Sequence, residues 1–164
     1  MQVTSSTKYE DFRPFEDCLA PEGVQTLTEA AERQYGAMHN LTIDEFFGIM
    51  NGDLSILGDL SEPKVLQVYW QKRFSQFCDE FATACERMTI QDTEQEQMQN
   101  GCLPMSPVEN VLTFTREYFG LPSFTAAGKR TIGEYLVARK DKYNQARVQR
   151  NYLQAQRKKF SKKK

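Results

Sequence analysis

Large apolar side chains recur at alternating intervals of four and three residues along the middle of the chain. They are Trp70, Phe74, Phe77, Phe81, Ala84 and Met88. This spacing places them on one face of a helix over residues 64–88, whereas Gln67 and Gln71 lie off that face. Burying one phenylalanine side chain contributes roughly 1.5–3 kcal/mol. We therefore expect this helix to form the hydrophobic centre of the fold, packed on the rest of the body or on a second copy.

Two capping boxes predict two shorter helices, one before and one after that central helix. In Thr42–Glu45 and in Ser106–Glu109, a hydroxyl and a carboxylate three residues apart can each accept a backbone N–H. The expected helices cover residues 43–50 and 107–119. The inner face of the second one is predicted to contain Val108, Val111, Leu112, Thr115, Tyr118 and Phe119. A weaker apolar pattern predicts an additional helix over residues 24–38.

The last helix is predicted to change character along its length. Thr131–Glu134 is a third capping box, which indicates a helix over residues 132–158; a continuous helix from Ser123 is the alternative. At about 100° per residue, its apolar residues and three arginines share one stripe. That stripe contains Ile132, Tyr135, Leu136, Arg139, Tyr143, Ala146, Arg150, Leu153 and Arg157. We expect residues 132–143 to pack on the body, whereas the helix beyond residue 146 is basic on all sides with aromatic residues interleaved.

The segments between and before these helices carry weaker signals. Residues 1–20 contain aromatic side chains interrupted by Pro14, and we expect an arm that docks on its own body or on a neighbouring subunit. Residues 53–59 are expected to form a half-buried loop or a short helical turn, and their spacing does not match a calcium-binding loop. Residues 91–100 are acidic and rich in glutamine, as in an exposed helix end or a linker.

Together these elements predict an all-α fold, a small bundle of about five helices with a long projecting basic C-terminal helix. We divide the chain into an acidic helical body, residues 1–127, and a basic helix with its tail, residues 128–164. No stretch has the length of apolar residues that a membrane span requires, and the N-terminus lacks a secretory pattern. We therefore expect no membrane partner, and a protein located in the cytoplasm or in an assembly formed there.

Charge is distributed very unevenly along the chain, although the overall composition is nearly neutral. Residues 129–164 contain 13 Lys and Arg but only Glu134 and Asp141 as acids, so this segment carries +11. The whole chain carries −1, which leaves −12 for residues 1–128. A nearly neutral protein thus consists of an acidic part joined to a strongly basic one, and this asymmetry indicates a charged partner.

No residue pattern indicates catalysis or a cofactor. Nucleotide-binding, serine-hydrolase and zinc-protease motifs are absent from the sequence. The single histidine, His39, follows a predicted helix end, which is typical of an exposed or capping residue. The four cysteines form no C-x-x-C pair, and we expect reduced thiols without a metal; they are Cys18, Cys78, Cys85 and Cys102. The sequence therefore predicts a protein that is not an enzyme.

Three interpretations of the basic segment compete. Its cations could neutralise phosphates while its aromatic rings stack on bases. It could instead contact an acidic protein surface, such as the body of a neighbouring copy. A solvated tail that keeps the protein soluble is the third. The candidate contact residues are Arg147, Arg150, Tyr152, Arg157, Lys158, Lys159, Phe160, Lys162, Lys163 and Lys164.

We accordingly expect a non-catalytic structural or assembly protein. Its acidic helical body would pack in a larger complex, and its basic C-terminal helix would engage a neighbouring subunit or nucleic acid. Small virion and phage morphogenesis proteins have this general build, which is an analogy of architecture alone. The alternative is a stand-alone protein that binds nucleic acid without sequence specificity, because no known DNA- or RNA-reading motif accompanies the basic segment.

Overall fold

The chain is described here from a computed structural model, which defines residues 21–55, 64–89 and 105–161. Within these ranges it forms six α-helices, one 3₁₀ helix and no β-sheet, which confirms the all-α class. The elements are α2 (Pro21–Tyr35), η2 (Met38–Asn40), α3 (Ile43–Met50), α4 (Lys64–Arg87), α6 (Pro107–Phe119), α7 (Phe124–Gly128) and α8 (Ile132–Ser161). The expectations for residues 1–20, for most of 53–59 and for 91–100 fall outside the described residues.

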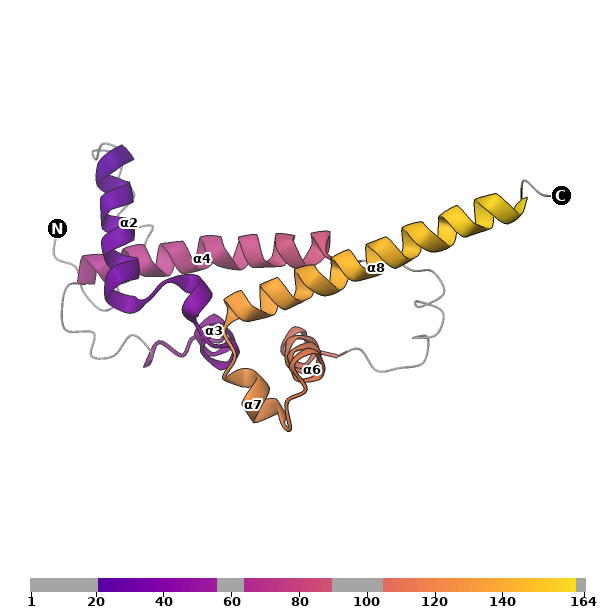
Figure 1. Ribbon diagram of the computed structural model, residues 1–164. Helices are drawn as coiled ribbons and strands as arrows, with labels where there is room; N and C mark the ends of the chain where they lie inside the picture. The colour runs from indigo at the N-terminus through magenta and orange to yellow at the C-terminus, as the bar shows by residue number, and fades with distance from the viewer. Residues whose placement is uncertain (1–20, 56–63, 90–104, 162–164) are drawn as a thin grey trace.

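Two long helices dominate the arrangement of the elements. In Figure 1, α2 stands steeply across the N-terminal end of α4, and α3, α6 and α7 lie together on one side of the long helices. α8 starts beside α3 and runs past the C-terminal end of α4 (Figure 1). The second half of α8 therefore extends away from the other helices.

The ring of Phe46, on α3, occupies the centre of the hydrophobic core. Four other aromatic rings lie with their centroids 5.0–5.9 Å from it: those of Phe47, Phe74, Phe77 and Phe81. Trp70 is fully buried beside them, and its indole N–H donates a hydrogen bond of 2.9 Å to the carbonyl of Gly36. The aromatic residues of α4 therefore bind α2, η2 and α3 into one unit.

The predicted seam of α4 is confirmed as a core face. Trp70, Phe74 and Phe77 are buried, and Phe81 packs against the same cluster. Gln67 lies off the seam but is buried as well, as is Tyr69, which directly precedes Trp70. α2 packs on this end of α4, so the N-terminal half of the helix is covered on more than one side.

The two capping boxes that precede α3 and α6 are confirmed. Each hydroxyl accepts the N–H of the glutamate three residues later, at 3.2 Å for Thr42 and 3.3 Å for Ser106, and each glutamate accepts in return at 2.8 Å. α2, in contrast, ends three residues earlier than predicted, at Tyr35. Gly36 follows it with a φ of 102°, a conformation that glycine adopts without strain and that ends a helix.

α8 begins at its own cap and does not continue from α7. Thr131 and Glu134 form the third capping box, with hydrogen bonds of 2.9 and 3.1 Å. An isolated antiparallel bridge joins Thr131 to Thr42, the residue that caps α3. In this bridge the N–H of Ile132 donates to the carbonyl of Leu41 at 2.8 Å. The starts of α3 and α8 are therefore held together by backbone hydrogen bonds.

Two glycines allow the close packing around this bridge. A Cβ atom at Gly128 would collide with the carboxylate of Asp44, and one at Gly133 would lie 2.9 Å from the carbonyl oxygen of His39. At Gly133 the obstacle is backbone, so this position favours a residue without a side chain; at Gly128 it is the end of the exposed Asp44 side chain, which a larger residue would displace.

Candidate interaction surface on the C-terminal helix

The first half of α8 is anchored to the rest of the protein. Ile132, Tyr135 and Ala138 are buried. Near the middle of the helix, the hydroxyl of Tyr118 on α6 donates a hydrogen bond of 2.7 Å to Asp141. Tyr118 had been predicted to face inward, but it is exposed and reaches across to α8; its hydrogen bond with this carboxylate raises the pKa of the phenol.

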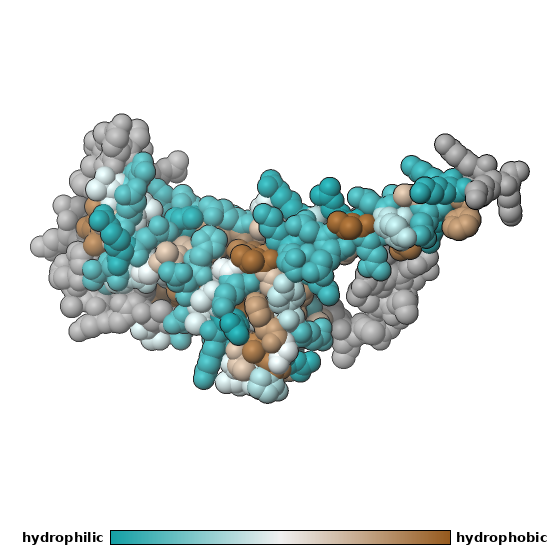
Figure 2. Space-filling view, in the orientation of Figure 1, coloured by the Kyte–Doolittle hydropathy of each residue, from teal (hydrophilic) through white to brown (hydrophobic). Residues whose placement is uncertain are grey.

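The second half of α8 has a different environment. From residue 147 to residue 160, every side chain is exposed except that of Gln156, which is partly covered and donates to the hydroxyl of Tyr152 at 2.6 Å. Four of these exposed side chains are large and apolar: Val148 at 69%, Tyr152 at 61%, Leu153 at 47% and Phe160 at 71% exposure. Figure 2 shows hydrophobic patches among hydrophilic atoms along this part of the helix.

The predicted cationic residues are brought together here as far as the structure describes them. Arg147, Arg150, Arg157, Lys158 and Lys159 are all exposed. At about 100° per residue, the first four fall within roughly a third of the helix circumference, whereas Lys159 lies on the other side with Val148 and Tyr152. Four of the five described cations therefore share one face, and the opposite face mixes Lys159 with apolar side chains. Lys162, Lys163 and Lys164 lie outside the described residues.

An alternation of four and three residues runs along all of α8. The positions are Ile132, Leu136, Arg139, Tyr143, Ala146, Arg150, Leu153, Arg157 and Phe160. The seam passes from buried at Ile132 to largely exposed at Phe160. Such spacing is that of a helix which packs lengthwise against another helix. The distal part thus carries the pattern of a packed helix without a covering partner among the described residues.

A second feature, an apolar groove of about 740 Å³ between α3, α4, α6 and α8, did not follow from the sequence. Arg139 lies at the groove, with its guanidinium 5.2 Å from the centre of the Phe114 ring. Its Nε atom is buried and has no hydrogen-bond partner within the described part of the chain. The signal in the sequence was an arginine inside the part of the stripe, residues 132–146, whose other members are apolar or aromatic.

The groove contains no activated nucleophile among the residues described. The sulfur of Cys85 lies 3.9 Å from the hydroxyl of Tyr135, and burial raises the pKa of both groups above their ordinary values. Burial likewise raises the pKa of the Cys78 thiol. These thiols therefore remain protonated at neutral pH, and a protonated thiol is a weak nucleophile.

The described residues form neither a cluster of metal ligands nor a membrane-spanning helix. The described ranges hold no group of three or more His, Cys, Asp or Glu side chains with the proximity that a metal ion requires. His39 is exposed, as predicted, and its ring packs edge-on against Phe77 at 4.9 Å. None of the described helices is both long and apolar enough to traverse a bilayer.

Comparisons with models of protein families, with curated proteins and with solved structures give no match. The functional inference therefore rests on the physical properties of α8 and of the surfaces around it.

Proposed function

We propose that this chain is a non-catalytic structural or assembly protein in the cytoplasm, whose helical body packs in a larger complex while the distal half of α8 engages a neighbouring subunit. The observation that supports this proposal is the exposure of Val148, Tyr152, Leu153 and Phe160 on a helix rich in cations. A tail that serves solubility alone requires charge and no large apolar side chains. Apolar groups ringed by polar ones are typical of a surface that a partner covers.

The anchored first half of α8 supports the same proposal. A free basic helix is weakly stable in water, because helix formation is costly without packing. Here the buried residues Ile132 and Tyr135 and the capping box at Thr131 start the helix and fix its direction. The distal residues are thus presented at a defined distance from the body, which lowers the entropy lost when a partner binds.

Binding of nucleic acid is the second candidate function, and one specific observation favours it. No acidic residue follows Asp141, and the exposed rings of Tyr152 and Phe160 lie among arginines and lysines. This combination suits a single strand, whose phosphates pair with cations and whose bases stack on aromatic rings. Such binding would weaken steeply as the salt concentration rises.

Removal of residues 147–164 tests the proposed function. The truncated protein should keep the helical circular dichroism of residues 21–146, because the described part of the deleted segment is exposed. The full chain should form concentration-dependent oligomers, or hold a partner through purification, in light scattering or sedimentation, and the truncated chain should not. A full chain that stays monomeric and partner-free would contradict the assembly function. Salt-sensitive binding of the full chain to single-stranded DNA, lost on truncation, would support the second candidate instead.

A further inference from the structure

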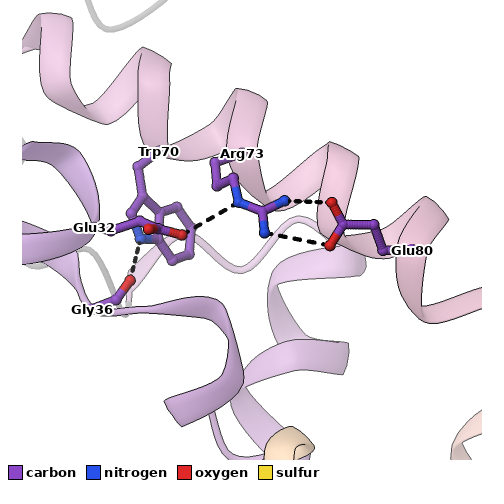
Figure 3. A network of polar contacts seen from close by, with 5 residues as sticks. All are labelled: Glu32, Gly36, Trp70, Arg73 and Glu80. Atoms are coloured by element: carbon purple, nitrogen blue, oxygen red, sulfur yellow. Dashed lines mark hydrogen bonds and ion pairs between the residues drawn. The ribbon is translucent and has the colours of Figure 1, made fainter. Parts of the chain in front are cut away.

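The solvent face of α4 carries two carboxylates that match the arginines of α8 in spacing. Asp79 and Glu86 are exposed, lie seven residues apart and form no ion pair with another described residue. Ala82 and Thr83 lie between them and are small. Glu80, by contrast, is held by Arg73 at 2.9 Å, and the same guanidinium reaches Glu32 at 3.3 Å (Figure 3).

The distal half of α8 presents the complementary arrangement. Arg150 and Arg157 are exposed, also seven residues apart, and form no ion pair with any residue in the described ranges. Leu153 lies between them on the same seam and is 47% exposed. Seven residues span about 10.5 Å on any α-helix. Two arginines of one helix can therefore meet two carboxylates of the other at the same time, in either relative direction, with Leu153 over the small residues.

We propose that the distal half of α8 packs on the Asp79–Glu86 face of α4 in a second copy of this chain. The inference rests on the proposed function and names the partner of one strip of the distal surface, the one formed by Arg150, Leu153 and Arg157. Its own α4 is an unsuitable acceptor, because α8 runs past the C-terminal end of α4 (Figure 1). Pairing of α8 with α8 along this seam would bring Arg150 and Arg157 against arginines, which like-charge repulsion disfavours.

Symmetry doubles the proposed contact. In a dimer with a two-fold axis, each α8 would lie on the α4 of the other copy, so that four ion pairs and two copies of Leu153 contribute. Exposed ion pairs are individually weak and are screened by salt. The dimer is therefore expected to be stronger at low ionic strength, and the +11 of residues 129–164 would face the −12 of residues 1–128.

Charge reversal and its rescue test this contact. The double variant R150E/R157E should self-associate at least about tenfold more weakly than the wild type, and D79K/E86K should do the same. A mixture of the two variants should recover the dimer, because each reversed α8 then meets a reversed α4. Sedimentation velocity from about 1 to 100 µM chain, at about 50 mM and about 500 mM salt, measures all four samples.

A matched control separates this contact from a general effect of charge. K140E/K142E changes the charge of α8 by the same amount at exposed positions outside the proposed contact, and it should leave the dimer within about twofold of the wild type. Circular dichroism should show the same helix content in every variant, since the four contact residues are exposed.

Each unfavourable outcome has a separate meaning. A wild-type chain that is monomeric at the highest concentration and lowest salt overturns the inference, as does a mixture of the two variants that fails to associate. If R150E/R157E abolishes binding to another protein or to DNA while D79K/E86K has no effect, the proposed role of α8 survives and the second copy is excluded as its partner. If neither variant nor truncation at residue 146 changes any association, both proposals fail.

Discussion

The two long helices, α4 and α8, have the same spacing of seam residues, but the α4 seam is buried in the core whereas the distal part of the α8 seam is exposed. α4 is 24 residues long and α8 is 30, and both carry an alternation of four and three residues, which starts at Trp70 in α4 and at Ile132 in α8. In α4 the seam is aromatic and lies within the core, whereas in α8 it is interrupted by Arg139, Arg150 and Arg157. The spacing determines which residues share a face; the residues themselves determine whether the protein's own core covers that face. An arginine in the seam suits a partner with anionic groups or an aromatic face, and Arg139 has the latter in Phe114.

A phenylalanine-to-alanine substitution should have very different effects on the free energy of unfolding in the two seams, and this is the largest effect we expect. Phe77→Ala removes a ring that is 1% exposed, and it should lower the free energy of unfolding by about 3–5 kcal/mol. Phe160→Ala removes a ring that is 71% exposed, and it should change that free energy by less than about 0.5 kcal/mol. Urea unfolding of dilute protein measures both. A comparable loss at both positions would show that the distal half of α8 is covered by its own chain.

A smaller effect should follow from loss of the cap that anchors α8. Thr131→Ala removes the hydroxyl that accepts the N–H of Glu134, and it should lower the free energy of unfolding by about 1 kcal/mol. Thr125→Ala, at an exposed position within α7, is the matched control and should have little effect. If the two variants unfold alike in urea, the cap does not contribute to the anchoring of α8.

The smallest effect should be the dependence of this cap on pH. The hydrogen bond from the N–H of Thr131, and then the nearby Arg130, hold the pKa of Glu134 below its ordinary value of 4.5. A carboxyl group with a lowered pKa in the folded state stabilises that state above 4.5, and the contribution is lost as the pH falls through the folded-state pKa. The difference in stability between the wild type and Glu134→Gln should therefore shrink below pH 4.5. A difference that stays constant from pH 7 to about 3 would contradict this assignment.

Local signals made much of the fold predictable. A capping box depends on residues three apart, so the starts of α3, α6 and α8 follow from Thr42, Ser106 and Thr131 without knowledge of the rest of the chain. The buried face of α4 was predictable for the same reason, because its apolar spacing is regular. The exposure of the cations from Arg147 to Lys159 agrees with the absence of an unbroken apolar face there.

Features that depend on contacts between distant segments did not follow from the sequence. Gln67 is buried although it lies off the seam, in the half of α4 on which α2 packs. Tyr118 is exposed, and its hydroxyl donates a hydrogen bond to Asp141, a residue 23 positions away. The groove beside Arg139 requires four helices to be placed correctly, and periodicity within one helix carries no information on that placement.

The backbone bridge between Thr42 and Thr131 fixes the start of α8 on the body, so each later residue of the helix has a set distance from the bridge. Arg150 lies 19 residues beyond the bridge, about 28 Å along a continuous helix, and its angle about the axis is fixed by the same count. One residue inserted near Ala146 would rotate every distal side chain by about 100° while leaving the composition and charge of the helix almost unchanged. The register of α8 is therefore as much a part of its surface chemistry as the arginines themselves.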